Sequence, residues 1–507
     1  MAQEHLDRLS SIDAGFLHQE DGGAHMHIGA LGVFTGTPPT GAQFRAHIAS
    51  RLPLVPRYRQ RLVAMPFGTG RPVWAEDEGF RVGYHVRHTA LPAPGSDEQL
   101  RTLASRIMSQ RLDRTKPLWE MWLVEGLAEG RFAVVAKTHH AMIDGVGGVD
   151  LLAVLFDVEP DAAPSPVPPW QPRPTPGAAG LLVDGARGAV RNAARLAARG
   201  AGYAVRPQQA AKDTASAALS LGEAMLPFVA GAPATPFNGT PGGHRRIELV
   251  RTELADYKRV KTVFGATVND VVLTAVAGAL GRFLADRGVA TADLVLKACV
   301  PVSVRRPERA GAAGNDITIM TAPLPVGIDD PVTRLAIVRR SMEHLKTSRQ
   351  ARGAQMLTSL ENALPPAVLA QASRLGFSSR MYNVLVTNVP GPQVPIYMLG
   401  RQLAELAPLA FLAPDHLLAI AIVSYQGQVT YGLLADADAL PDLADLAAHL
   451  RDTLAELVQA ASEVDKVDHA GDRADDTTGA PVGTAQWPAS SQVRPTPTLT
   501  SSGTDSG

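Results

Sequence analysis

A proline-crowded stretch divides this sequence and limits the folds that it can adopt. Between 160 and 176 the chain reads PDAAPSPVPPWQPRPTP. Proline fixes its own φ and lacks a backbone N–H, so this stretch excludes a regular helix or a central strand and favours extended polyproline conformation. The sequence therefore predicts two folded parts that a linker separates.

Both flanking parts alternate strand-like and helix-like segments. Residues 1–158 include IGALGVF, FRAHIASRL and FAVVAKTHH, and residues 245–462 include RRIELVRTEL, NDVVLTAVAGALGRFLADRG and LLAIAIVSYQGQVTYGLLAD. This alternation is typical of α/β or α+β layers. We expect an N-terminal half over 1–158, a Pro-rich linker and helical crossover over 159–244, and a C-terminal half over 245–462.

The last part of the chain has a different composition. Residues 463–507 lack apolar periodicity and carry seven acidic against three basic side chains. Such segments cannot bury enough apolar surface to fold, so this part is predicted to be a disordered acidic tail.

Four arginines mark the predicted crossover helix. Arg187, Arg191, Arg195 and Arg199 recur every four residues in an Ala-rich segment. This spacing places them on one helix face. One interpretation is contact with an anionic membrane or lipid-droplet surface, and the other is a solvated crossover helix.

Composition excludes several classes of protein. The chain has 48 basic and 49 acidic side chains, which argues against nucleic-acid binding. A single cysteine, Cys299, excludes an internal disulfide and a CxxC site. No signal-peptide pattern and no apolar run of spanning length is evident, so we expect a cytoplasmic protein.

The segment FAVVAKTHHAMIDGVGGVD is the most informative for chemistry. His139, His140, Asp144 and Gly145 spell HHxxxDG between a predicted buried strand and an apolar helix. A histidine that is neutral near pH 7 suits a general base acting on a hydroxyl group. Taken singly, the histidine pair could be incidental and the aspartate a helix cap. The complete pattern at a strand-to-helix junction is more specific.

Other chemistries have little support. The sequence contains no GxSxG, Walker-type, GxGxxG or HExxH motif. His25 and His27 share one face of a predicted strand but have no third ligand at a sensible spacing, so we interpret them as core or channel lining. We therefore predict no metal site and no bound cofactor.

Several motifs together resemble one family. HHxxxDG is similar to the signature of the CoA-dependent acyltransferase superfamily. The further segments are LSSIDAGFL (9–17), MHIGAL (26–31), PLWEMWLVEGL (117–127), NDVVL (269–273), PVSVR (301–305) and NVPGP (388–392). Over about residues 5–460 the chain resembles the bacterial wax ester synthase/acyl-CoA:diacylglycerol acyltransferase family.

That resemblance implies a fold and a set of site residues. The fold is a pair of chloramphenicol-acetyltransferase-like halves, a pseudo-dimer with a central channel. It implies that His140 is the general base, His139 a supporting residue, and Asp144 a structural residue of the loop, next to Gly145. Arg305 is the candidate partner of Asp144.

Two further motifs supply candidate supporting residues. Asn269 and Asp270 match the family's ND motif and could equally cap the long helix that follows. Thr387 and Asn388 precede the Pro390-Gly391 turn and are candidates to stabilise an oxyanion, with simple turn chemistry as the alternative.

The implied activity is O-acyl transfer. A long-chain acyl group would move from acyl-CoA, a co-substrate, to diacylglycerol or a long-chain alcohol, without a covalent acyl-enzyme. The alternatives are a polyketide-type or other hydroxyl acceptor, and a non-catalytic lipid-binding or storage-granule protein. The expected location is the cytoplasm, peripheral to a membrane or lipid droplet.

Overall fold

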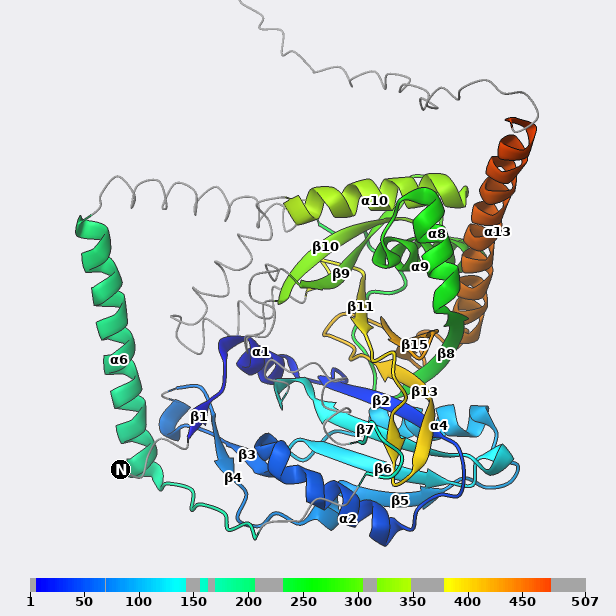
Figure 1. Ribbon diagram of the computed structural model, residues 1–507. Helices are drawn as coiled ribbons and strands as arrows, with labels where there is room; N and C mark the ends of the chain where they lie inside the picture. Colours follow the sequence, from blue (N-terminus) through cyan, green and yellow to red (C-terminus); the bar gives the residue numbers. More distant parts are fainter. Residues whose placement is uncertain are drawn as a thin grey trace, which may run out of the picture. The chain divides into compact units, whose positions relative to one another are not determined.

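Two six-stranded mixed sheets form the core of the protein (Figure 1). The computed structural model describes residues 6–68, 70–142, 156–162, 169–205, 231–303, 317–347 and 378–475. The chain divides into two compact units, Met1–Ala461 and Ser462–Gly507, and both sheets belong to the first.

The first sheet has the strand order β12-β13-β2-β7-β6-β5. Its strands are β2 (His27–Phe34), β5 (Val86–Ala90), β6 (Trp119–Glu125), β7 (Phe132–His139), β12 (Tyr397–Met398) and β13 (Arg401–Leu409). The helices of this region are α1 (Ser11–Gln19), α2 (Gly41–Arg51), α3 (Val82–His85), α4 (Asp97–Ser109) and the 3-10 turns η1 (Leu52–Leu54), η2 (Pro56–Arg59), η3 (Pro66–Gly68), η4 (Ala128–Gly130) and η5 (His140–Met142).

Helices α2 and α4 begin where the sequence provides caps. Thr40 and Ser96 each form a capping box with a glutamine three residues later. Helix α4 buries Leu100, Ala104, Ile107 and Met108, the spacing of one helix face. These residues pack in the same core as Val33 of β2 and Val135 of β7. Helix α2 buries Phe44 and Ile48 in a separate core with Phe34 and Phe132.

The second sheet has the strand order β10-β9-β11-β14-β15-β8. Its strands are β8 (Arg245–Glu253), β9 (Val295–Ser303), β10 (Ile317–Pro325), β11 (Val384–Pro390), β14 (Leu418–Tyr425) and β15 (Gln428–Asp436). Its helices are α8 (Leu254–Phe264), α9 (Val268–Asp286), α10 (Pro331–Thr347) and α13 (Leu443–Asp475).

Helix α9 is the centre of the second core. It contributes fourteen buried residues, most of them apolar. Its apolar side chains pack with strand residues such as Val384 and Ile420 and with α10 and the start of α13. Among the described helices α9 alone is long and apolar enough to cross a membrane, but 78% of that stretch is buried inside the protein. Its composition therefore fits a core helix.

Two strands from late in the sequence join the first sheet. β13 pairs antiparallel with β2, with Ala407 opposite Leu31 (Figure 1). β12 pairs antiparallel with β13. The sequence predicts these residues in a C-terminal half that begins at 245. The sheets divide the chain differently, because β12 and β13, which belong to the second half of the sequence, are part of the first sheet.

A third, small sheet has the order β1-β4-β3 and contacts the crossover helix. Its strands are β1 (Asp7–Arg8), β3 (Gln60–Val63) and β4 (Val73–Glu76), and the helix is α6 (Ala178–Val205). Leu181 of α6 packs with Met65 and Val73. Of the linker and crossover that the sequence predicts over 159–244, residues 163–168 and 206–230 lie outside the described residues.

Helix α13 runs past residue 463, where the sequence predicts the acidic tail to begin, and ends at Asp475. No proline interrupts residues 463–475, and continuing an existing helix adds one hydrogen bond for each residue fixed. Residues 476–507 lie outside the described part.

The two sheets meet closely at Gly432 of β15. A Cβ at this position would lie 1.8 Å from the Pro408 carbonyl oxygen of β13. Backbone lies against backbone here, so a side chain at 432 would have to push β13 away from β15.

We expect Gly432→Ala to lower the free energy of unfolding by about 1–3 kcal/mol, the usual cost of overpacking. Thermal unfolding of the purified protein measures this as a lower midpoint. Gly243→Ala is the matched control, since a Cβ there meets no atom within 4 Å. Equal midpoints for the two variants would contradict the close approach.

Candidate active site

Strand β7 ends at the histidine pair. Its apolar residues are buried between β2 and β6, as the sequence predicts for Phe132–Thr138. The His139 N–H donates to the Leu118 carbonyl (2.9 Å), and the His140 N–H donates to the Met26 carbonyl (2.8 Å). The backbone of both histidines is therefore fixed by neighbouring segments of the same half.

The His140 ring lies between two phenylalanines. It stacks on Phe16 of α1 with ring centroids 4.0 Å apart, and it meets the edge of Phe411 with centroids 5.4 Å apart. Phe411 follows β13, the strand that the second half contributes. His140 therefore lies where the two halves meet.

This surrounding keeps His140 neutral. The side chain is partly exposed, but its Nδ1 is buried without a hydrogen-bond partner in the described chain. Burial, and secondarily the neighbouring His139, lower the pKa of His140 to about 4. At neutral pH the ring is uncharged, the form that can accept a proton.

His139 has a different environment and is fully buried. Its Nδ1 accepts a hydrogen bond from the Ala141 N–H (3.0 Å), which assigns the proton of the neutral ring to Nε2. That Nε2 faces Glu20 Oε2 at 3.7 Å. Burial lowers the pKa of His139 despite the nearby carboxylate. These contacts favour a supporting role.

Glu20 is a site residue that the sequence did not reveal. It directly follows α1, and its Oε2 accepts from Arg114 Nε (2.7 Å) while Oε1 lies 3.3 Å from His27 Nε2. Burial raises the pKa of Glu20, but His139, His27 and the charge of Arg114 outweigh it, so the pKa lies below its ordinary value. A carboxylate inside the N-terminal half thus links Arg114 to the histidine strand.

His25 and His27 line this same cluster. Their ring centroids are 5.6 Å apart, and His27 pairs with His139 across the strands. Burial lowers the pKa of His25 to about 4 and that of His27 to about 3. Within the described ranges no three His, Cys, Asp or Glu side chains are placed to hold a metal ion.

The ND motif and the NVPGP motif meet in the second half. Asn388 Nδ2 donates to Asn269 Oδ1 at 3.4 Å. The N-cap of α9 is Thr267, whose side chain accepts from the Asp270 N–H, while Asp270 Oδ2 accepts from the Thr267 N–H. The predicted capping function thus belongs to Thr267 and Asp270, and Asn269 contacts the turn strand.

Thr387 and Asn388 lie on opposite faces of β11, because side chains alternate along a strand. Leu385, on the Thr387 face, packs in the core that contains Phe16 and Phe411. Val384 and Val386, on the Asn388 face, pack in the α9 core. Thr387 is therefore the one of the two on the face toward the His140 neighbours.

Three predicted site residues lie outside the described residues. Asp144 and Gly145 fall within 143–155, and Arg305 falls within 304–316. The helix predicted to start at Asp144 or Gly145 belongs to the first of these segments.

Comparison with known families identifies the chain. The wax ester synthase/diacylglycerol acyltransferase (WS/DGAT) catalytic domain matches residues 9–272, and the WS/DGAT C-terminal domain matches residues 313–458. The chain belongs to the WS/DGAT family. The resemblance inferred from the motifs is thereby confirmed, and so is the prediction that the chain is an acyltransferase.

Individual relatives agree with the family. This WS/DGAT chain is 33% identical over 466 residues to a probable diacylglycerol O-acyltransferase of Mycobacterium tuberculosis (strain ATCC 25618 / H37Rv), an alignment that covers 89% of this chain and 96% of that protein. The structure of the wax ester synthase/diacylglycerol acyltransferase from Marinobacter aquaeolei VT8 matches with a TM-score of 0.63 at 26% identity, over 90% of this chain and 100% of that one.

A condensation domain shows the same fold. The starter condensation domain of rhizomide synthetase matches this WS/DGAT chain with a TM-score of 0.56 at 15% identity, over 90% of this chain and 94% of that one. The predicted α/β pseudo-dimer is thereby confirmed.

We expect Glu20→Gln to lower kcat roughly tenfold, the usual scale for losing a group that orients an active-site residue. The amide keeps the shape of the side chain but removes the charge that pairs with Arg114 and faces His139. Initial rates at saturating acyl-CoA measure kcat. Glu129→Gln is the control, because that side chain is 81% exposed. An unchanged kcat in Glu20→Gln would contradict the orienting function.

Proposed function

We propose that this acyltransferase moves a long-chain acyl group from acyl-CoA to the hydroxyl of diacylglycerol or of a long-chain alcohol, with His140 as general base. One observation carries the residue assignment. His140 lies at the meeting of the two halves, between Phe16 and Phe411, with a pKa lowered to about 4. The products are triacylglycerol or wax ester.

The proton transfer is assigned to Nε2 of the His140 ring. Because Nδ1 is enclosed, Nε2 takes the proton of the acceptor hydroxyl. The hydroxyl oxygen then attacks the thioester carbonyl, and a tetrahedral intermediate forms. The carbon–sulfur bond breaks, and the protonated ring returns its proton to the sulfur of CoA. No acyl-enzyme is formed.

The oxyanion of that intermediate needs a donor. We assign this function to the Thr387 hydroxyl in preference to Asn388, since Thr387 shares the face of β11 toward Phe16 and Phe411. Asn388 and Asn269 support the turn instead through their hydrogen bond. The family resemblance gives Asp144, with Gly145 and its candidate partner Arg305, the task of holding the histidine loop.

The relatives support this choice of substrates. The Marinobacter relative is described as a wax ester synthase/diacylglycerol acyltransferase, and the rhizomide condensation domain was solved in complex with C8-CoA. Acyl-CoA is therefore the donor that we propose, and no bound cofactor takes part.

We expect His140→Ala to lower kcat at least a hundredfold, the lower end of the contribution of a positioned general base. The assay measures release of CoA thiol from palmitoyl-CoA with diacylglycerol, with hexadecanol, or with no acceptor. His244→Ala is the matched control, because His244 is an exposed loop histidine.

The outcomes separate the proposed function from its alternatives. Acceptor-dependent release that His140→Ala abolishes supports the proposal. Release without acceptor would indicate a thioesterase. Absence of release with every lipid alcohol would contradict the proposal and favour a polyketide-type acceptor or a non-catalytic lipid-binding or storage-granule protein.

We also propose that α6 brings the enzyme to an anionic membrane or lipid-droplet surface from the cytoplasm. Arg187 and Arg191 are exposed, and so are Val183 and Val190 of the same helix. An exposed helix with arginines and apolar side chains suits the interface of an anionic lipid surface. The side chains of Arg195 and Arg199 are not described.

We expect replacement of Arg187, Arg191, Arg195 and Arg199 by glutamine to weaken binding to phosphatidylglycerol vesicles at low salt, by about 1 kcal/mol for each charge that reaches the surface. Co-sedimentation with vesicles measures the binding, with phosphatidylcholine vesicles for comparison. The four-lysine variant retains the charge and is expected to bind as the wild type does. Equal binding by the glutamine variant would contradict the proposal.

A further inference from the structure

Arg59, at the end of η2, is a largely buried arginine. The whole residue is 8% exposed, and its Nε has no hydrogen-bond partner in the described part of the chain. The Arg59 carbonyl accepts from the Asp77 N–H, which fixes the backbone at this point. The guanidinium therefore has at least one N–H donor left for an anion.

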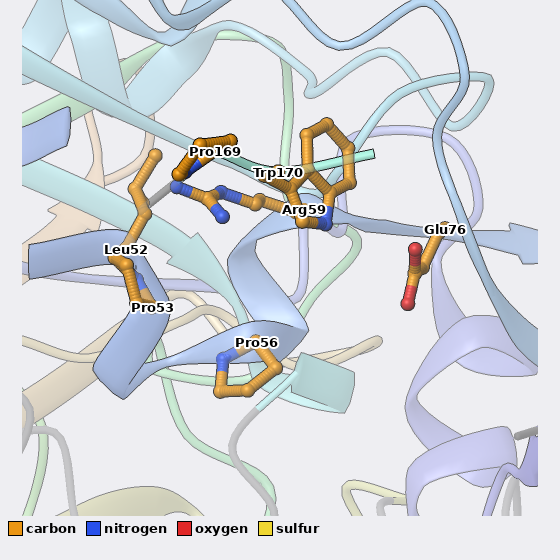
Figure 2. Close-up of a pocket in the computed structure, with 7 residues that line it drawn as sticks. All are labelled: Leu52, Pro53, Pro56, Arg59, Glu76, Pro169 and Trp170. Atoms are coloured by element: carbon orange, nitrogen blue, oxygen red, sulfur yellow. The ribbon is translucent and has the colours of Figure 1, made fainter. Parts of the chain in front are cut away.

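The surroundings of Arg59 are apolar and aromatic. A pocket of about 250 Å³ is lined by Arg59 together with Leu52, Pro53, Pro56, Glu76, Pro169 and Trp170 (Figure 2). The guanidinium carbon lies 4.9 Å from the centre of the Trp170 ring. In Figure 2 the guanidinium extends toward Leu52 and Pro169 and away from Glu76. The cation therefore points into an apolar space.

Glu76, the one carboxylate among these lining residues, is engaged elsewhere. It accepts hydrogen bonds from the Arg173 backbone N–H (2.8 Å), Nε (3.0 Å) and Nη2 (2.8 Å). Burial lowers the pKa of Arg59, and the charge of Glu76 opposes that effect only in part. Glu76 is thus bound to Arg173, and the guanidinium of Arg59 can bind a different anion.

We propose that this pocket binds the carboxylate of an amphiphilic carboxylic acid, such as a free fatty acid, through Arg59. A guanidinium offers two parallel N–H donors that match a carboxylate. The leucine, proline and tryptophan side chains suit the hydrocarbon next to that headgroup. A phosphate dianion carries more negative charge than a carboxylate, so the Glu76 carboxylate would repel it more strongly, while Arg59 supplies the same single positive charge. Phosphate binding is therefore disfavoured.

The pocket is separate from the proposed catalytic residue. Its walls come from η1, η2, β4 and the Pro-rich linker, whereas the His140 ring lies against Phe16 and Phe411. Binding at Arg59 is therefore independent of the proposed catalytic function and can be measured without turnover.

The test measures binding of sodium octanoate, octyl phosphate and 1-octanol to the full-length protein by calorimetry. We expect wild type to bind octanoate at least tenfold more tightly than Arg59→Gln does, and more tightly than it binds octyl phosphate. Binding of 1-octanol is expected to be equal in the two proteins. Arg61→Gln is the matched control, since Arg61 carries the same charge two residues away and lies 3.8 Å from Asp77.

Thermal unfolding provides a second readout. Octanoate is expected to raise the midpoint of wild type and of Arg61→Gln but not that of Arg59→Gln, because a ligand stabilises only the protein that binds it. Trp170→Ala, a change in the linker, is expected to weaken octanoate binding without loss of the fold.

Two results would overturn the proposal. One is octanoate affinity that is equal in wild type and Arg59→Gln, which would place octanoate elsewhere in the protein or at no specific site. The other is a preference for octyl phosphate over octanoate that depends on Arg59, which would make the pocket a phosphate site.

Discussion

The pairing of β13 with β2 is the interaction on which the site depends. It places a strand from the second half in the first sheet, with Leu409 opposite Gly29. The chain leaves β13 at Leu409 and runs directly to Phe411, which contacts the His140 ring. If the two sheets folded without this exchange, His140 would lose the phenylalanine that comes from the second half.

A polar network in the first half includes the buried side chains of Glu20 and His139. Arg114, Glu20 and His139 form a chain of contacts in the first half. The N–H groups of the two histidines donate to the Leu118 and Met26 carbonyls, which fixes their backbones. The two histidines thereby have different surroundings. The His139 ring contacts the Ala141 N–H and faces Glu20. The His140 ring lies between Phe16 and Phe411, and burial keeps it neutral.

Local patterns in the sequence predicted most individual elements. The apolar run at Phe132, the helix after Asn269 and the alternating segment that forms β14 and β15 are found where they were expected. The strand exchange could not be predicted, because pairing between Leu403 and Phe34 joins residues far apart in sequence and leaves no periodic signal.

The candidate site was likewise predictable only in part from the sequence. The histidine pair was visible as a motif, and so were Asn269 and Asn388, which the structure brings together. Phe16 lies within a recognised motif but carries no chemical signal of its own, and Phe411 and Glu20 had no signal at all. Each depends on tertiary placement, which composition and spacing do not encode.

We propose His140, neutral at physiological pH, as the general base. The most direct test is the pH dependence of kcat at saturating palmitoyl-CoA and diacylglycerol between pH 5.5 and 8. With the pKa of His140 lowered to about 4, the ring stays unprotonated over this range, so kcat at pH 5.5 should lie within about twofold of its value at pH 8. A fall of about tenfold at pH 5.5, as an ordinary histidine with a pKa near 6.5 requires, would contradict the account.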